Sequence, residues 1–458
     1  MGVIRRPRLA DHRRHELRRL AARSNQVVLF AAITGATTGV FVAGFEYLVV
    51  DVLFEGTHGM PLPVVALLPA LGLLVSLGAR RWIGGGISPA TADEYLHAFH
   101  DSRVELGPRD AVARVVAATA TLGSGAPMGL EGPSLYVGAT FGSNLQRRFP
   151  RVFERADHRI LLVAGAAAGV AAIFKAPATG AVFALEVPYQ DDLARRMLLP
   201  ALVASVSGYL AFAAILGTAP LFPIEQATAF ELRDLIGAAV VGIVAGLGAR
   251  TFARLLRTAK TIAGRPGRLA GVVNVVVAGS VLGALFALGR VLTGESLLVG
   301  SGYQVVAWAG DPARSIPVLI AILCLRSFAT AAAVAGGGAG GLFIPLVVGG
   351  ALTGTIIGHV VDDGDLTLFL VIGVAAFLGA GYRVPLAAVM FVAETTGRPS
   401  FVVPGVIAAV TAELMMGNSS VTRYQRSTNL LATDAGSDAD ADADADGDAE
   451  TGPDESTG

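Results

Sequence analysis

The 458-residue sequence has one cysteine, few aromatic residues and few charged residues. A single cysteine, Cys324, excludes an intrachain disulfide framework, and no Cys/His spacing matches a metal site, so neither a metal nor a cofactor is expected. Charged residues make up 16% of the chain, whereas a soluble domain carries about 25%. Short segments of alternating hydrophobicity, the signature of a transmembrane β-barrel, are also missing.

What the chain has in quantity is apolar sequence, with 53% hydrophobic residues and a mean hydropathy of +0.61. A bilayer-spanning helix needs about 20 apolar residues. Runs that approach or exceed this length occupy residues 26–54, 62–79, 111–145, 159–187, 196–217, 229–256, 270–293, 315–335, 341–361, 366–396 and 401–416. Many of the 57 glycines and 22 prolines fall inside these runs, where a broken helix survives only against protein or a water-filled cavity. We therefore predict an all-α polytopic membrane protein.

The two ends of the chain carry opposite charge. Residues 1–25 contain eight arginines and two acids, and the apolar run that follows is too long for a signal peptide. We predict that this segment stays in the cytoplasm, before the first membrane helix. An adjacent membrane helix explains the arginines, so nucleic-acid binding is not expected.

Residues 426–458 form a tail after the last apolar run, and its part 434–458 has ten acids and no base, which predicts disorder. The tail does not match a calcium-binding loop. Lysine occurs twice in the chain, against a large excess of arginine, which together with the acidic tail indicates a prokaryote with a GC-rich genome. Lys175 either attracts anions at a cytoplasmic mouth or extends its ammonium toward the membrane surface.

The second half of the membrane region repeats the first. Residues 163–186 align without gaps on residues 371–394, and eight of these 24 positions are identical: Val163/Val371, Gly165/Gly373, Ala167/Ala375, Ala168/Ala376, Ala172/Ala380, Pro177/Pro385, Phe183/Phe391 and Glu186/Glu394. Upstream, Gly129–Pro133 (GLEGP) aligns on Gly341–Pro345 (GLFIP). We place the two halves at residues 26–217 and 229–425. Gly/Pro-interrupted segments at matching places of two halves are the best sequence indication of a transporter's binding site.

Glu131 lies within the first of these interrupted segments. It is the one charged residue between Arg114 and Arg147. A carboxylate at membrane depth costs about 2.5–3.5 kcal/mol on insertion scales, and such residues usually line an ion pathway. The glycines around it fit a broken helix whose free N–H groups face an anion. The alternative is an acid that merely caps a helix N-terminus.

These features resemble the CLC family of chloride channels and proton-coupled chloride antiporters. The family's G-x-E-G-P and G-x-F-x-P motifs are matched at Gly129–Pro133 and Gly341–Pro345, in the family's order and at matching places of a repeat. The resemblance covers residues 26–425. It implies two inverted-topology repeats of tilted, broken and re-entrant helices, and a homodimer in which each subunit has its own anion pathway.

The resemblance also implies roles for single residues. The backbone amides of Leu342 and Phe343 would face a central anion. The amides of Leu130, Glu131 and Gly132 would face an outer site, where the Glu131 side chain competes with anions and acts as a gate. Backbone N–H groups at helix N-termini can replace the hydration shell of chloride without a full positive charge that would trap the ion.

The chain departs from the family pattern in its first glycine motif. The family's G-S-G-I-P is represented by Gly84–Ser88 (GGGIS), followed by Pro89. By resemblance Gly85, Gly86 and Ile87 are anion-site candidates, but Gly85 replaces the serine ligand. Ser88 could replace that ligand if the loop shifts, and a plain loop between helices is the alternative.

Two further family residues lack a clear match near the ends of the halves. Thr422 occupies the position of an anion-contacting tyrosine, and Tyr424, two residues on, is the candidate to replace it. Val187 stands where antiporters of the family often carry an inner proton-transfer acid. Glu186 and its repeat partner Glu394 are interpreted as structural, each tying down an equivalent helix end.

We therefore predict transport of chloride or a similar small anion, gated by Glu131, in the plasma membrane of a prokaryote. A channel and a proton-coupled antiporter both remain open, although Val187 argues against standard proton coupling. The alternative is another inverted-repeat secondary transporter, for a cation or an organic solute. An enzyme is not expected, because the paired acids or Ser/His set of an intramembrane protease are missing.

Overall fold

The computed structural model describes residues 8–57, 59–153, 158–222, 230–265, 267–361 and 366–427, with side chains from residue 25 onward except at residue 268. Residues 8–25 of the basic segment form the first part of α1, continuous with the predicted first membrane helix, and the tail lies outside the described residues from residue 428 onward. The main helices are α1 (Arg8–Glu46), α2 (Leu62–Gly78), α3 (Thr91–His100), α4 (Pro108–Gly123), α5 (Glu131–Arg148), α6 (Ile160–Phe174), α7 (Pro177–Glu186), α8 (Leu198–Leu216), α9 (Leu232–Ala263), α10 (Arg268–Thr293), α11 (Tyr303–Ala309), α12 (Ile316–Ala335), α13 (Phe343–Val361), α14 (Leu366–Tyr382), α15 (Pro385–Thr396) and α16 (Val402–Met416).

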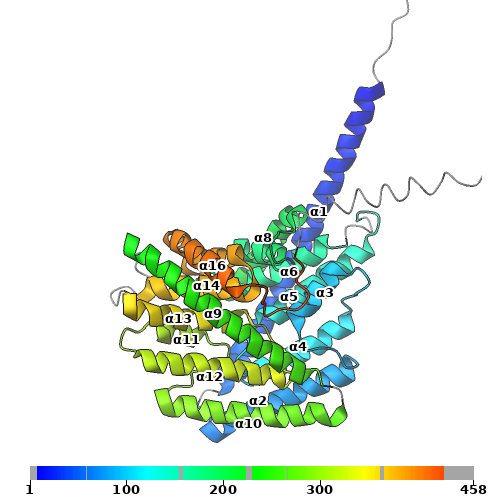
Figure 1. Ribbon diagram of the computed structural model, residues 1–458. Coiled ribbons are helices and arrows are strands. Elements are labelled where there is room, and N and C mark those ends of the chain that lie inside the picture. Colours follow the sequence, from blue (N-terminus) through cyan, green and yellow to red (C-terminus); the bar gives the residue numbers. More distant parts are fainter. Residues whose placement is uncertain are drawn as a thin grey trace, which may run out of the picture.

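Short helical turns extend or precede some of these helices: η1 (Tyr47–Phe54), η2 (Glu55–Thr57), η3 (Ala79–Ile83), η5 (Arg195–Met197) and η6 (Pro399–Phe401). Within the described ranges, eight helical segments are long and apolar enough to cross a bilayer. The prediction of an all-α, multi-pass membrane protein is confirmed. Figure 1 shows these helices packed into one bundle, from which the start of α1 projects.

Three of the apolar runs are broken as the glycines and prolines predicted. Run 111–145 divides into α4 and α5, run 159–187 into α6 and α7, and run 366–396 into α14 and α15. At two of the breaks a basic residue takes a left-handed conformation, with φ of 54° at Lys175 and 59° at Arg383. These two residues are repeat partners, so the halves break their helices in the same way.

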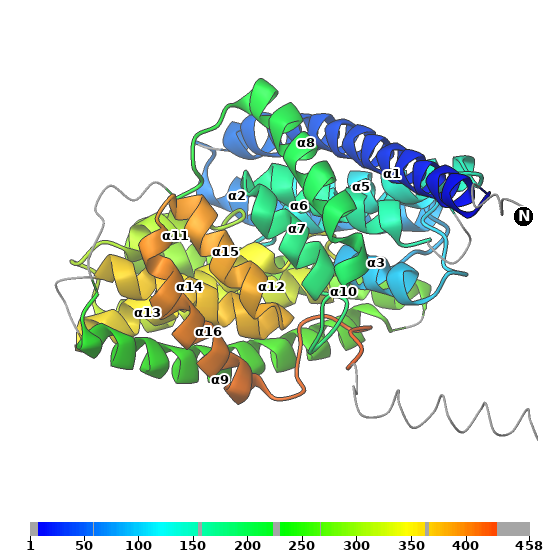
Figure 2. The same cartoon turned by 90° about the horizontal axis from the view of Figure 1, so that it is seen from above.

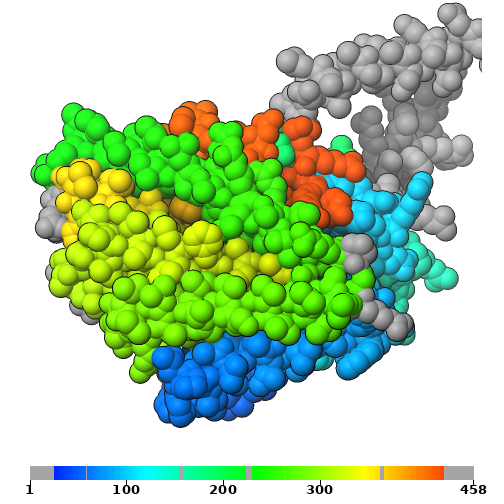
Figure 3. Space-filling model, turned by 60° about the horizontal axis from the view of Figure 1, so that its bottom comes forward, coloured from blue at the N-terminus to red at the C-terminus, as the bar shows by residue number. Residues whose placement is uncertain are grey.

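The two halves also pack alike. In the first, α5 packs on α6, and α6 contacts both α1 and α8; in the second, α13 packs on α14, and α14 contacts both α9 and α16. Figure 2 shows α1 with α8 along one edge and α9 with α16 along the opposite edge. Helices α2 and α10, at equivalent places, pack against each other across the halves, as the blue and light green bands of Figure 3 show.

Glycines allow close helix contacts at equivalent places in each half. A Cβ on Gly138 of α5 would overlap the carbonyl oxygen of Gly165 in α6, and a Cβ on Gly165 would overlap that of Gly138. Gly350 of α13 and Gly373 of α14 face each other in the same way. Close backbone approach of this kind is typical of small-residue interfaces between membrane helices.

Two repeat-related glutamates connect the halves. Glu186, at the end of α7, accepts hydrogen bonds from the amides of Leu386 and Ala387 at the start of α15, at 3.1 and 2.8 Å. Glu394 of α15 accepts from the amides of Ala178 and Thr179 at the start of α7, at 2.9 and 2.6 Å. Each acid therefore satisfies N–H groups of the other half that have no partner within their helix. The structural interpretation of both acids is confirmed.

Candidate functional site

The two glycine motifs meet inside the bundle. The amide of Gly129 donates to the carbonyl oxygen of Gly341 at 2.9 Å, and the amide of Gly341 donates to that of Gly129 at 2.7 Å. This reciprocal pair forms an isolated antiparallel bridge. Because α5 begins two residues after Gly129 and α13 two residues after Gly341, the bridge brings two helix N-termini together. Such N-termini offer unpaired N–H groups and a partial positive charge.

The Glu131 carboxylate occupies the space between these N-termini. Its Oε1 accepts a hydrogen bond from the Phe343 amide at 2.6 Å, and its carboxylate also interacts with the amide of Ile344. The side chain is 4% exposed. Its Oε2 is buried and has no hydrogen-bond partner among the described residues. The carboxylate was predicted at the outer site; it binds amides at the N-terminus of α13, among them that of Phe343, which was predicted to face the central anion.

Two cavities flank this contact. The first, which we call the basic cavity, has a volume of about 480 Å³ and reaches Gly341, Leu342 and Met128. The second, the apolar cavity, has a volume of about 240 Å³ and reaches Leu130 and also Met128. Met128 is 2% exposed and lines both cavities. The Gly129–Gly341 bridge and Glu131 thus lie between the basic cavity and the apolar cavity.

The two cavities open toward opposite ends of α10. Arg265, just before that helix, lines the basic cavity. Val299, just after it, lines the apolar cavity. A helix of 26 residues is about 39 Å long, which exceeds the hydrocarbon thickness of a bilayer. The cavities therefore approach the site from the two faces of the membrane-spanning bundle.

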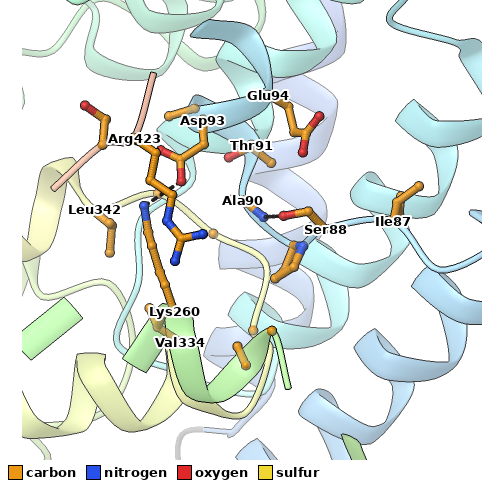
Figure 4. Close-up of a pocket in the computed structure, with 18 of the residues that line it drawn as sticks. Ile87, Ser88, Ala90, Thr91, Asp93, Glu94, Lys260, Val334, Leu342 and Arg423 are labelled. Atoms are coloured by element: carbon orange, nitrogen blue, oxygen red, sulfur yellow. Dashed lines mark hydrogen bonds and ion pairs between the residues drawn. The ribbon is translucent and has the colours of Figure 1, made fainter. Parts of the chain in front are cut away.

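Positive charge prevails around the basic cavity. Its lining includes four basic residues and two acids, namely Arg80, Lys260, Arg265, Arg423, Asp93 and Glu94. Figure 4 shows Lys260 reaching Asp93, with Nζ 2.7 Å from Oδ2. Glu94 lies 3.6 Å from the guanidinium of Arg114, a buried residue behind the wall. Because both acids have basic partners, the excess positive charge of the lining favours anions.

Several residues predicted from the resemblance lie on these walls. Gly86, Ile87 and Ser88 line the basic cavity, and the Ser88 hydroxyl accepts from the amide of Ala90 at 3.2 Å (Figure 4). Gly85 is not among the residues that line the basic cavity; it lines a neighbouring surface depression, which shares Arg80, Gly86 and Ile87 with that cavity. The segment 84–90 is a loop before α3, so the loop interpretation holds for its structure.

Tyr424 lines the basic cavity at its exposed mouth. Its side chain is 46% exposed. Its ring stacks on His97, with centroids 4.6 Å apart. Thr422 also lines the cavity, and its amide donates to Ser420 at 3.2 Å.

Tyr382, at the end of α14, is a residue that sequence reasoning missed. It lines the basic cavity beside Leu342, and its hydroxyl interacts with the Leu342 amide. The side chain is 2% exposed. Its ring faces that of Phe343 at 6.2 Å, while Phe174 faces Phe343 from the other half at 4.3 Å. The repeat alignment, in which Tyr382 is the partner of Phe174, was the available signal.

Two other sequence hypotheses concern Val187 and Lys175. Val187 is buried at 1% exposure, and its carbonyl oxygen accepts from the Gln425 side chain at 3.0 Å. Lys175 lines neither cavity; its ammonium is 5.9 Å from the centre of the Phe212 ring, and its charge acts on Glu46, at the end of α1. Lys175 therefore does not lie at the mouth of the basic cavity. In the described part of the chain, no three His, Cys, Asp or Glu side chains cluster as a metal site.

The comparison with known proteins agrees with this arrangement. An H(+)/Cl(−) exchange transporter ClcA of Salmonella paratyphi B is 26% identical over 423 residues, which cover 88% of each chain. A CLC-type fluoride/proton antiporter has a similar fold, with a TM-score of 0.76, 22% identity, and coverage of 88% of this chain and 98% of that one. A slow cyanobacterial Cl−/H+ antiporter gives a TM-score of 0.75 at 22% identity, over 85% of this chain and 94% of that one.

The family to which this chain belongs is shown by a match to a family sequence model. The sequence model described as "Voltage gated chloride channel" matches residues 71–417, which contain both glycine motifs and all helices from α3 to α16. That span is well over half of the chain. The two glycine motifs that it contains are in contact in the structure, through the bridge between Gly129 and Gly341. This chain therefore belongs to the voltage gated chloride channel family.

Proposed function

We propose that this protein transports chloride or a similar small anion across a membrane, through a pathway that Glu131 gates. The observation that carries the proposal is the 2.6 Å hydrogen bond from the Phe343 amide to the Glu131 carboxylate, between two cavities that share Met128 as a lining residue. In this arrangement a carboxylate oxygen stands in for the transported anion.

The chemistry of the gate follows from competition for the same amides. An ionised carboxylate is a strong acceptor, and a hydrogen bond to a charged group contributes about 1.5–3 kcal/mol. A proton on Glu131 removes the charge, weakens that bond and frees the Phe343 amide for an anion. Anion flux should therefore rise as the pH falls. The low dielectric of the site makes this competition stronger than it would be in water.

We propose Tyr382 rather than Tyr424 as the tyrosine that contacts the central anion. The support is positional: Tyr382 is buried next to Leu342 and faces Phe343, whereas Tyr424 is at the cavity mouth and engaged with His97. Gly86, Ile87 and Ser88 stay candidate contacts on the cavity wall, and Leu130 and Gly132 stay candidates at the outer site. Gly85, which lies outside the cavity, keeps the least support.

A channel and a proton-coupled exchanger both agree with this site. The names of the similar proteins include proton exchangers, whereas Val187 leaves an apolar side chain where the family's inner acid would stand. We expect chloride gradients to drive little proton movement. Stoichiometric proton pumping would show that another acid or a chain of waters replaces the missing residue.

The decisive experiment is flux from liposomes that contain the purified protein, followed by chloride and proton electrodes together. Wild-type protein should release chloride faster at acidic pH, and Glu131→Gln should remove most of that pH response. Glu295→Gln, at an exposed acid paired with Arg314 at 3.6 Å, is the matched control. If Glu131→Gln keeps both the rate and the pH response of the wild type, Glu131 is not the gate.

The same liposomes separate the alternative function. A cation transporter would release sodium and not chloride, and an organic-solute transporter would release neither. Cation sites favour carboxylates and carbonyl oxygens, whereas this site is built from amides and one acid. Chloride, fluoride and nitrate in parallel would define the selectivity.

We further propose, from the family resemblance, a homodimer in the plasma membrane of a prokaryote, with the N-terminus and the basic cavity on the cytoplasmic side. Two halves, 26–217 and 229–425, would form the transport domain between the basic segment 1–25 and the acidic tail 426–458. The exposed apolar faces of α8 and α16, such as Leu210 and Leu414, suit contact with lipid or with a second copy. Crosslinking in native membranes would test the oligomeric state.

A further inference from the structure

Arg80 is a partly buried cation of the basic cavity for which the described residues provide no acid. It lies in η3, directly after α2, on the cavity wall. Its Nη1 is 3.5 Å from the carbonyl oxygen of Ile87, a long hydrogen bond. Its Nε is buried without a partner among the described residues. The charged group that acts on it most strongly is Arg114, which repels it.

The other charges of the cavity do not compensate Arg80. Asp93 pairs with Lys260 at 2.7 Å, and Glu94 lies 3.6 Å from Arg114. Arg265 and Arg423 are exposed, so water screens their charges. Removing a charge from water without a partner is costly, and buried charges are normally paired. The positive charge of the Arg80 guanidinium is therefore not compensated by an acid among the described residues, which favours binding of an anion there.

The surrounding backbone leaves room for this guanidinium. Gly337, with φ of 77°, lies in the loop before α13, and a Cβ there would overlap Nη2 of Arg80. On the other side, the Gly86 amide donates to the carbonyl oxygen of Arg80 at 2.9 Å. Arg80 thus contacts both glycine-rich loops of the cavity: the one before α3 and the one that leads to the Glu131 site.

We propose that Arg80 binds a small monovalent anion in the basic cavity, as a station next to the Glu131 site. The inference rests on the proposed anion transport and adds a cationic ligand to it. The guanidinium supplies N–H donors on the wall that Gly86 and Ile87 form, in a glycine motif that lacks the serine ligand of the family pattern. Because the cavity is wide and opens to water, the ion is held loosely and can move on toward Leu342.

The test compares three variants in oriented liposomes, with chloride varied on the side of the basic cavity. Arg80→Gln should raise the half-saturating chloride concentration about tenfold, as expected for loss of a hydrogen bond to a charged group, while the flux at saturating chloride stays near wild type. Arg80→Lys keeps the charge and should recover most of the affinity. Arg81→Gln is the matched control, because Arg81 is the neighbouring arginine, is exposed and does not line the basic cavity.

Equal half-saturating chloride concentrations in Arg80→Gln and wild type would overturn the proposal for Arg80. The proposed function would still stand in that case, because the wild-type liposomes release chloride. Wild-type liposomes that release no anion would instead reject the proposed function itself. A second measurement does not depend on how the variants fold. Crystals of the wild type grown in bromide should show an anomalous peak within contact distance of the Arg80 guanidinium, and a basic cavity without that peak would also overturn the proposal.

Discussion

The two halves of the protein are nearly alike where they hold the bundle together and differ where they meet the candidate ion site. Both halves have a glycine turn, a helix that begins two residues later, a glycine contact to the next helix, and a glutamate that caps the other half. At the first residue of that helix, one half has Glu131 and the other has Phe343. The carboxylate of the first binds the amide of the second. The duplicated framework thus provides two helix N-termini that favour anions, and the side chain at the start of one binds the backbone amide at the start of the other.

A second difference is found around the Phe343 ring. Phe174 and Tyr382 are repeat partners, and both rings approach Phe343. The tyrosine adds a hydroxyl on the side of the basic cavity. Residues that are alike in the two halves are therefore the structural ones, and positions at which the repeat partners differ are the candidate functional ones.

The largest effect should come from removing the acid that distinguishes the halves. Glu131→Ala leaves the Phe343 amide without its carboxylate partner, and about 1.5–3 kcal/mol of competing hydrogen bonding is lost. We expect chloride efflux that no longer depends on pH and, at alkaline pH, exceeds the wild-type rate about ten- to a hundredfold. Efflux from liposomes at acidic and alkaline pH measures this. Glu105→Ala, at an exposed acid paired with Arg147, is the control, and an equally pH-dependent Glu131→Ala would contradict the assignment.

The next effect concerns the packing that the halves share. Gly138→Ala and Gly350→Ala each place a methyl group against a carbonyl oxygen of the neighbouring helix, and overpacking of this kind costs about 1–3 kcal/mol. Thermal unfolding in detergent should show similar losses of stability for the two variants. Gly44→Ala is the control, because no atom lies within 4 Å of a Cβ at that helical position. A large loss for one glycine alone would mean that the halves are not equivalent in packing.

The reciprocal caps allow a finer comparison. Glu394 accepts from two amides and also from the Thr179 hydroxyl at 2.6 Å, whereas Glu186 accepts from two amides. Loss of a cap costs about 0.5–2 kcal/mol, so Glu394→Ala should destabilise more than Glu186→Ala. Thr179→Val should reduce that difference in thermal unfolding. The opposite order would show that the caps differ for a reason other than the hydroxyl.

The sequence predicted the parts of this structure that depend on short-range pattern. The interrupted runs, the repeat and the two glycine motifs indicated broken helices and a shared site at Glu131, and the structure brings Gly129 and Gly341 together. The short helices α3 and α11, of 10 and 7 residues, were not predicted. Neither run is long or apolar enough to stand out from a loop.

The cavity walls were beyond sequence reasoning for a different reason. Which side chain faces a cavity depends on how three or more elements pack, and spacing along one helix does not contain that information. Tyr424 matched the expected position within two residues but lies at the cavity mouth, whereas Tyr382 reaches the wall from α14. Lys175 has a charge that suggested a cytoplasmic mouth, but the α6–α7 break places it near Glu46.

The smallest expected effect tests the second difference between the halves. Tyr382→Phe gives the position the side chain of its repeat partner Phe174 and removes one hydroxyl without changing the packing of the ring. A single neutral hydrogen bond contributes about 0.5–1.5 kcal/mol, so the half-saturating chloride concentration should rise about two- to tenfold. Tyr424→Phe should leave it unchanged, because that hydroxyl is at the exposed mouth. Equal effects of the two variants in the liposome assay would mean that neither tyrosine contacts the central anion, and the difference between Tyr382 and Phe174 would then reflect packing alone.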